Sequence, residues 1–187
     1  AFGKTAPGTT FDSAVMRGWG VRGSNWEFSA GVQHELAPRV AVDAGYFRRV
    51  FGNIGVTYDR NLTPADYDTF SITAPVDPRL PGGGGYQISS LYNIKPAKFG
   101  LPSDVLFTAA DNFGKQIQHW NGVDITANVR PRAGVLLQGG VSTGKTLTDN
   151  CAILAKLPEI SQLGVPYCHQ ETPYLTQVKM FGAMSSR

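Results

Sequence analysis

Polar and apolar side chains alternate along two neighbouring stretches in the second half of the chain. Within residues 116–130, the odd-numbered positions 117, 123, 125, 127 and 129 are apolar. The even-numbered positions, such as Asp124, are mostly polar. Because successive side chains of a strand point to opposite faces, this pattern predicts a strand with one apolar and one polar face. Residues 131–134 (Pro-Arg-Ala-Gly) predict a turn, and the alternation resumes over residues 135–143.

The same alternation predicts further long strands over Ser24–Leu36, Val40–Tyr58 and Thr172–Ala183, with a tight reversal at residues 37–39. A weaker pattern predicts a strand around residues 14–20. An ordinary strand has about 5–6 residues, whereas about 9–11 tilted residues cross a bilayer. The strand lengths therefore favour a membrane barrel.

Two long segments separate the predicted hairpins. Residues 59–112 are rich in proline and glycine, and within them we expect a strand at Val105–Ala109 and single helical turns at residues 65–68 and 96–100. The second segment is residues 147–171. Short turns at one edge and long loops at the other are typical of outer-membrane barrels. We predict an all-β fold of long antiparallel amphipathic strands, forming one β-barrel fragment over residues 1–187 without a plug domain, in which 59–112 is the extracellular-type loop.

Composition narrows the function classes. The 187 residues are 42% hydrophobic and 17% charged, with 22 glycines and 12 prolines, and no run approaches the roughly 18 apolar residues of a membrane helix. The net charge of +3 comes without a basic cluster, so we expect no nucleic-acid partner. Cys151 and Cys168 are close enough in sequence to form a disulfide across the 147–171 loop, although two free thiols remain the alternative. A disulfide favours an oxidising compartment.

Four strings of the sequence carry a family resemblance, and they span Gly18–Arg49, Thr63–Tyr86, Gly114–Arg130 and Leu136–Cys151. Together they resemble the C-terminal portion of the barrel in TonB-dependent, Oar-like outer-membrane receptors. The resemblance implies a barrel larger than this chain, embedded in outer-membrane lipid and energised from the inner membrane through the TonB system. It implies transport or recognition of a large ligand or oligosaccharide, with the long loops making first contact.

Aromatic side chains are frequent in the segment that would make this contact. Exposed aromatic rings could stack on a ligand, or they could pack the loop onto itself, and the sequence leaves both interpretations open. The ligand-binding candidates are Tyr58, Tyr67, Phe70, Tyr86 and Tyr92.

A secreted polysaccharide-binding or glycoside-cleaving protein is the alternative function. A pair of carboxylates is the usual apparatus of glycoside hydrolysis, and acidic residues occur on the predicted polar faces at Glu27, Glu35, Asp43 and Asp124. The same residues could simply line a mixed-charge lumen. We therefore assign no catalytic residue; were the chain an enzyme, it would be a carbohydrate-active hydrolase or lyase.

Two further motifs suggest cofactors. Residues 139–146 match the phosphate-binding pattern Gly, four residues, Gly-Lys-Thr, which makes a nucleotide binder the third hypothesis. The preceding segments alternate, whereas the parallel sheet of a nucleotide-binding fold has strands buried on both faces. Ca²⁺ in the long loop is a further hypothesis, although the spacing is not that of an EF-hand; the residues considered are Asp59, Asp66, Asp68 and Asp77.

Overall fold

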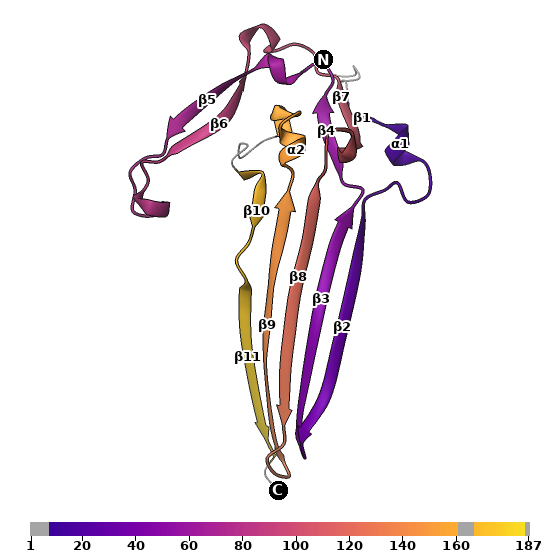
Figure 1. Ribbon diagram of the computed structural model, residues 1–187, viewed down its shortest axis with the longest axis vertical. Coiled ribbons are helices and arrows are strands. Elements are labelled where there is room, and N and C mark those ends of the chain that lie inside the picture. Colours follow the sequence, from indigo (N-terminus) through magenta and orange to yellow (C-terminus); the bar gives the residue numbers. More distant parts are fainter. Residues whose placement is uncertain (1–7, 161–166, 186–187) are drawn as a thin grey trace, which may run out of the picture. The chain divides into compact units, whose positions relative to one another are not determined.

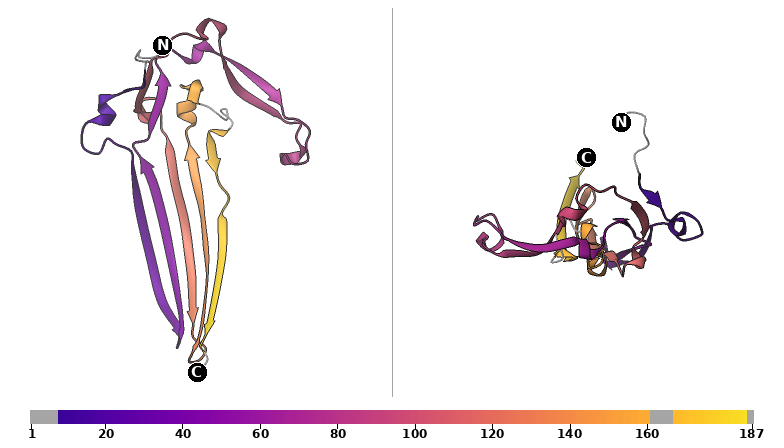
Figure 2. Two further views of the ribbon diagram at one scale, coloured as in Figure 1. Left: turned by 180° about the vertical axis from the view of Figure 1, so that it is seen from behind. Right: turned by 90° about the horizontal axis from the view of Figure 1, so that it is seen from above.

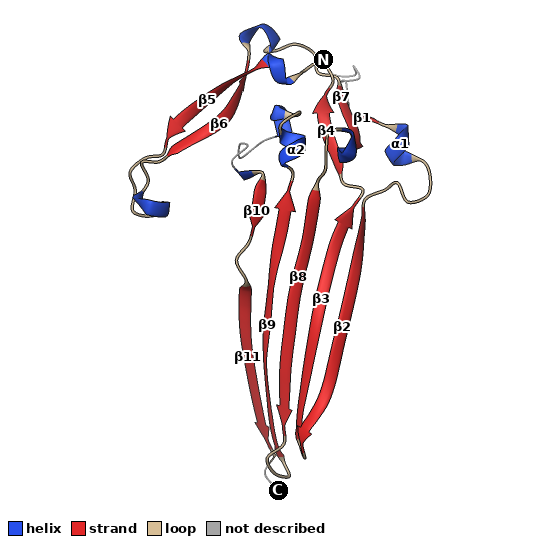
Figure 3. Cartoon of the chain, viewed as in Figure 1, coloured by secondary structure: helices blue, strands red, loops and turns tan. Residues whose placement is uncertain are grey.

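The computed structural model describes residues 8–160 and 167–185. Most of these residues lie in β-strands, and the few helices are short (Figure 3). The chain divides into two compact units, which are described separately. The strand unit comprises Asn25–Gly52, Gln118–Leu147 and Gln170–Arg187, and the loop unit comprises Ala1–Ser24, Asn53–Ile117 and Thr148–His169.

The strand unit is built on one sheet with the strand order β10-β9-β8-β3-β2, and β11 also pairs with β9 (Figure 1). The left view of Figure 2 shows these strands side by side from behind. Four of them have 13–15 residues. Their bounds are β2 Ser24–Ala37, β3 Val40–Gly52, β8 Ile117–Val129, β9 Val135–Asp149, β10 His169–Glu171 and β11 Leu175–Met184.

The register of the sheet keeps like side chains on one face. Along β3 and β8, Ala44 lies opposite Ile125, and the same parity sets Val40 opposite Val129. Along β9 and β11, Val178 lies opposite Val141. Directly opposite residues of paired strands share a face. The predicted apolar and polar faces of the single strands therefore combine into one apolar and one polar face of the sheet.

The loop unit holds the remaining strands in two small sheets. In the first, β4 (Gly55–Asp59) pairs antiparallel with β7 (Val105–Ala109), which also pairs in parallel with β1 (Thr10–Phe11). In the second, β5 (Tyr67–Thr73) and β6 (Gln87–Ile94) form an antiparallel hairpin. The short helices are α1 Ser13–Met16 and α2 Cys151–Leu154, and 3₁₀ turns cover Pro64–Asp66, Pro81–Gly83, Pro96–Lys98, Ala110–Asn112 and Pro158–Ile160.

The hydrophobic core among the described residues lies in the loop unit. Ile153 of α2 is fully buried and packs with Val56, Ala110 and Leu157. The Tyr58 ring lies edge-on to Phe113 beside this cluster, with centroids 4.7 Å apart. Among the described residues, each buried hydrophobic side chain belongs to the loop unit.

The predicted disulfide is present in the loop unit. Cys151 at the start of α2 is bonded to Cys168, with 4.8 Å between the Cα atoms. The backbone N–H of Asn150 donates to the carbonyl of Cys168, which adds a second link at the same point. A covalent link across 17 residues restricts the unfolded chain, and in the chain-entropy model this stabilises the fold by roughly 3 kcal/mol.

Several predicted elements need correction. The strand expected over Val40–Tyr58 is two strands, because Asn53 adopts a positive φ and its side chain donates to the carbonyl of Arg22. The strand expected around residues 14–20 is wrong: Asp12 accepts a hydrogen bond from the N–H of Ala14 and caps α1 there. Other bounds shift by a few residues.

The two long segments are more regular than expected. Residues 59–112 contain the unpredicted hairpin of β5 and β6, together with helical turns close to the two that were predicted. The segment 147–171 begins inside β9 and ends with β10. No helix in the described part of the chain combines the length and hydropathy needed to cross a membrane.

Shortening the buried side chain of Ile153 is expected to destabilise the loop unit. The change Ile153→Ala leaves a cavity in a closed cluster, so the free energy of opening should fall by about 2–5 kcal/mol. Hydrogen–deuterium exchange of the backbone amides of β4 and β7 measures this directly. Val76→Ala is the matched control, because Val76 is 87% exposed and its truncation should change exchange little. Equal effects of the two variants would contradict the assigned core.

Candidate functional site: the polar face of the strand unit and the anchored loop

A groove lies on the polar face of the strand unit. It has a volume of about 730 Å³, within the range of ligand pockets. Side chains from β2, β3, β8 and β9 line it, so the groove crosses four neighbouring strands. The lining includes Glu27, Arg49, Gln118, Trp120, Asp124 and Thr146.

Two glycines form the floor beneath the indole ring of Trp120. A Cβ atom placed on Gly144 would lie 2.6 Å from the ring, and one on Gly122 would collide with it. The ring therefore lies flat against the backbone of β8 and β9, in space that any other residue at these positions would fill. The Phe47 ring covers Gly45 on β3 in the same way, at 2.9 Å from a Cβ placed there. The Trp120 side chain stays 36% exposed, so part of its ring reaches the groove.

Charged and polar groups surround this ring. Glu27 of β2 forms an ion pair with Arg49 of β3. The hydroxyl of Ser142 on β9 donates to the carboxylate of Asp124 on β8. Both carboxylates keep acceptor capacity, because an ionised carboxylate has about four acceptor positions.

The four carboxylates of the enzymatic alternative do not form one group. Glu27 and Asp124 line the groove, and Asp43 lines an adjoining hollow together with Asp124. Glu35 instead accepts a hydrogen bond of 3.1 Å from the backbone N–H of Arg39 in the β2–β3 turn. Arg39 has a positive φ of 71°, which is costly for a side chain with a Cβ, and this bond supports it. Glu35 therefore has a structural role at the turn.

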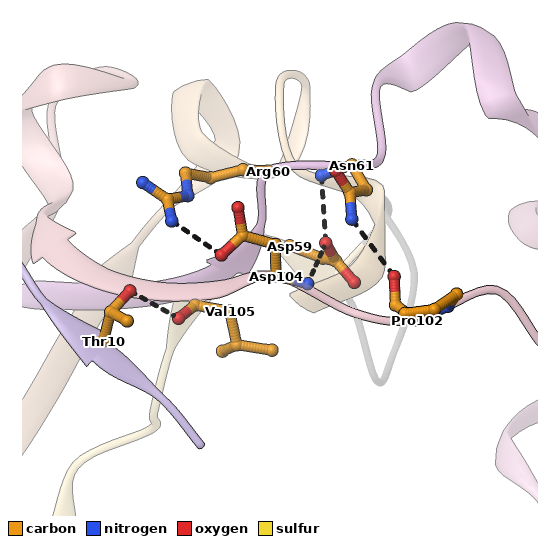
Figure 4. A network of polar contacts seen from close by, with 7 residues as sticks. All are labelled: Thr10, Asp59, Arg60, Asn61, Pro102, Asp104 and Val105. Atoms are coloured by element: carbon orange, nitrogen blue, oxygen red, sulfur yellow. Dashed lines mark hydrogen bonds and ion pairs between the residues drawn. The ribbon is translucent and has the colours of Figure 1, made fainter. Parts of the chain in front are cut away.

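The loop segment of residues 59–112 is fixed at its base by a polar network (Figure 4). Asp59 accepts hydrogen bonds from the backbone N–H groups of Asn61 and Asp104, at 2.9 and 3.0 Å. Arg60 forms an ion pair of 2.6 Å with Asp104, and the Asn61 side chain donates to the carbonyl of Pro102. These contacts join the two ends of a segment of about 45 residues, so its closure does not depend on apolar burial.

The five aromatic ligand-binding candidates separate into two groups. Tyr67 and Tyr92 lie edge to face on the β5–β6 hairpin with centroids 6.4 Å apart, and Tyr58 packs beside the core. Phe70 and Tyr86 are exposed. The first group packs the loop onto itself, and the second remains accessible to a ligand. Packing of the loop onto itself therefore holds for the first group, and ligand binding by Phe70 and Tyr86 stays a prediction.

The four aspartates considered for Ca²⁺ have separate protein partners. Thr63 donates its backbone N–H and its hydroxyl to Asp66, while Asp77 pairs with Arg79 at 2.7 Å. The Thr63 bonds hold the pKa of Asp66 below its usual range. Asp68 lies 3.9 Å from the Lys95 ammonium, and Asp59 belongs to the network at the loop base. The described residues contain no cluster of acidic, histidine or cysteine side chains arranged to hold a metal ion.

The phosphate-binding pattern at residues 139–146 lies entirely within strand β9. Gly139 to Gly144 are paired with β11, and Lys145 forms an ion pair with Glu171 and lies 5.1 Å above the ring of Tyr174. A phosphate-binding loop needs a bend of free backbone N–H groups before a helix. An extended, paired strand does not provide this geometry.

Sequence reasoning missed the role of Trp120. The alternation set this residue among the polar positions, which is unusual for an indole. One sequence signal for the placement of this ring is Gly122, two positions further along the same strand. A glycine there leaves room for a ring on that face. The contribution of Gly144 depends on strand pairing, and the sequence alone does not give it.

An acidic group in the loop unit has one oxygen atom without a hydrogen-bond partner among the described residues. The group is the partly buried Glu159, and the atom is its Oε1. Burial is the main cause that raises the pKa of Glu159, although backbone hydrogen bonds at Glu159 and Asp59 lower it. Burial also raises the pKa of Tyr67 to about 12, and the charges of Glu159 and Asp59 add to this effect.

Replacing Glu159 by glutamine is expected to stabilise the loop unit at neutral pH. A raised carboxyl pKa means that the folded state binds the proton more tightly, so folding loses stability as pH rises from the unfolded pKa of about 4.3 through the folded value. Glu159→Gln does not lose stability in this way, because glutamine does not ionise. The stability difference between the variant and the parent should disappear as the pH falls below that range. Hydrogen exchange of the loop unit at several pH values measures it.

The matched control is Asp111→Asn, which removes the same charge from an exposed position. Its effect on the free energy of opening should be small at each pH. A Glu159→Gln variant that is less stable than the parent at neutral pH would contradict the assigned cost of this carboxylate.

Comparison of the chain with models of protein families, with curated proteins and with solved structures found no match.

Proposed function

We propose that the chain forms part of the wall of a β-barrel in a bacterial outer membrane, in a TonB-dependent receptor of the Oar-like type. In this proposal the apolar face of the strand unit contacts lipid and the polar face lines the lumen. The loop unit belongs to the extracellular side, where it makes first contact with a large ligand. The single observation that carries the proposal is the exposed apolar face of a sheet with strands of 13–15 residues.

Exposure of this face is extensive. Val32 is 64% exposed, Ile125 49% and Val178 67%, and they belong to three different strands. Burying such a side chain is worth about 1.5–3 kcal/mol, so a face of this kind is costly in water. Lipid supplies the apolar surroundings that the described residues of the strand unit do not.

The height of the apolar face fits a bilayer. Ten residue steps separate Leu36, next to the β2–β3 turn, from Trp26, near the start of β2. At about 3.3 Å per residue this is about 33 Å along the strand, or about 25 Å along the membrane normal at a tilt of about 40°. Outward-facing apolar bands of outer-membrane barrels are about 25 Å tall. Between Leu36 and Trp26, His34 is the polar exception among the side chains of β2 on this face.

Trp26 and Phe28 lie near the end of the apolar face that is distant from the β2–β3 turn, and Tyr46 lies about halfway along it. Trp26 stacks with Phe28 at 6.5 Å between ring centroids. The hydroxyl of Tyr46 donates to the Asn121 side chain at 2.9 Å, and Arg48 donates to the same atom. The Trp26 and Phe28 rings have the position expected at the boundary between lipid and water, where barrels carry aromatic girdles.

Two neighbouring residues of β8 provide a test of the proposal. Ile125 lies on the apolar face and Thr126 on the polar face. In a membrane, Ile125→Arg should lower the free energy of unfolding by about 2–4 kcal/mol, whereas Thr126→Arg should change it little. Folding into lipid vesicles under urea titration, followed by the heat-dependent shift in electrophoretic mobility, measures both.

For a water-soluble protein, the expected effect of Ile125→Arg on stability is different. There, Ile125→Arg would replace an exposed apolar side chain and leave stability unchanged or improved. Equal stability of the two variants in vesicles, or a chain that stays monodisperse in buffer without detergent or lipid, would overturn the proposal.

A further inference from the structure

The polar face of the strand unit combines three features that bear on the ligand. An aromatic ring lies flat with one side covered by backbone, hydrogen-bonding groups surround it, and the groove continues along the strands. We propose that this groove is a binding subsite for an uncharged oligosaccharide, with Trp120 as the platform for a sugar ring. This inference builds on the proposed function, because a barrel wall would make the polar face line the passage that a ligand follows.

The platform depends on the two glycines beneath it. With Gly122 and Gly144 under the indole, one side of the ring contacts backbone, and the side that remains is the one toward the groove. The face of an aromatic ring carries partial negative charge, and the C–H bonds on one side of a sugar ring carry partial positive charge. A flat indole with one covered side therefore offers a surface for stacking with little loss of side-chain entropy on binding.

The polar groups around the platform match sugar hydroxyls. A hydroxyl both donates and accepts, and the groove offers carboxylate acceptors at Glu27 and Asp124, an amide at Gln118 and a hydroxyl at Thr146. Arg49 holds the Glu27 carboxylate in place through their ion pair. Mixed donors and acceptors beside an apolar ring are what a ligand with a ring and several hydroxyls requires.

The balance of charge favours an uncharged ligand. A second hollow of about 500 Å³ adjoins the first, and the two share Phe47, Asp124 and Ser142 among their lining residues. The charged residues that line the two hollows from the polar face are Glu27, Asp43 and Asp124, against Arg49 and Lys179. Arg48 also belongs to the lining, but its guanidinium donates to Asn121 on the apolar face. Three acidic groups against two basic ones repel an acidic polymer and attract a basic one only weakly.

The length of the groove favours an oligosaccharide over a single sugar. Along β9 the lining extends from Thr146 in the first hollow to Gln138 in the second, which is eight residues. At about 3.3 Å per residue this is about 26 Å. Gln177 and Lys179 of β11 continue the polar lining at the second hollow. A chain of several sugar rings could therefore contact the sheet at more than one level.

The test measures binding of defined sugars to the full chain. The protein is prepared in a detergent without a sugar headgroup and titrated by calorimetry with maltohexaose, cellohexaose and xylohexaose, and with hexagalacturonate as an acidic comparison. We expect at least one neutral hexasaccharide to bind and the acidic one not to bind. Absence of binding by all three neutral sugars, or preferred binding of hexagalacturonate, would overturn the inference.

Substitutions then locate the subsite. Trp120→Ala should weaken binding by about tenfold or more, as truncation of a central aromatic anchor does, and Trp120→Phe should retain part of the affinity. Gly122→Ala should also weaken binding, because its methyl group displaces the indole from its floor. Trp26→Ala is the matched control, since Trp26 lies on the apolar face of the same sheet. Unchanged affinity in Trp120→Ala would overturn the assignment of the platform.

Failure of this inference can be told apart from failure of the proposed function. A chain that folds into vesicles with the expected difference between Ile125→Arg and Thr126→Arg, but binds none of the neutral sugars, refutes the subsite alone. A chain that binds a neutral sugar through Trp120 but stays monodisperse without detergent or lipid refutes the membrane placement and supports the subsite.

Discussion

The strand unit depends on one constraint, which is that hydrogen-bonded register and residue parity agree across neighbouring strands. Ala44 lies opposite Ile125 and Val178 opposite Val141, so apolar side chains meet apolar side chains on one face. A slip of one residue between two strands would move every side chain of one strand to the other face. The exposed apolar surface, the groove of the polar face and the covering of the glycines all follow from this agreement.

The loop unit is stabilised by other means. Its cluster around Ile153 is small, and a disulfide, an aspartate cap at α1 and the network around Asp59 supply the remaining constraints. Such contacts suit a segment rich in proline and glycine, which has few long strands to pair. The loop unit therefore has a core, whereas the strand unit has two exposed faces.

The sequence predicted the strand unit well, because a period of two is visible in the sequence of a single strand. The faces of β2, β3, β8, β9 and β11 and both tight turns agree with the structure. The hairpin of β5 and β6 was missed, since its strands are short and lie among prolines. The position of the Trp120 ring was missed for another reason. The ring lies over Gly144, and this contact exists only because β9 pairs with β8. The family resemblance and the placement in an outer membrane stay predictions.

The strand order also says how this chain would behave when purified. Among the described residues, β2 ends the sheet on one side, with the backbone groups along its outer edge unpaired, and β11 ends it along most of β9 on the other. A border of this length acts as a template for further strands. Edge-to-edge pairing of sheets has no fixed end point, so isolated copies would pair with one another and form ribbons. Detergent or lipid bound to the apolar face would not prevent this, because it leaves the strand edges free. Handling this protein therefore calls for low concentrations, or for peptides that occupy both borders.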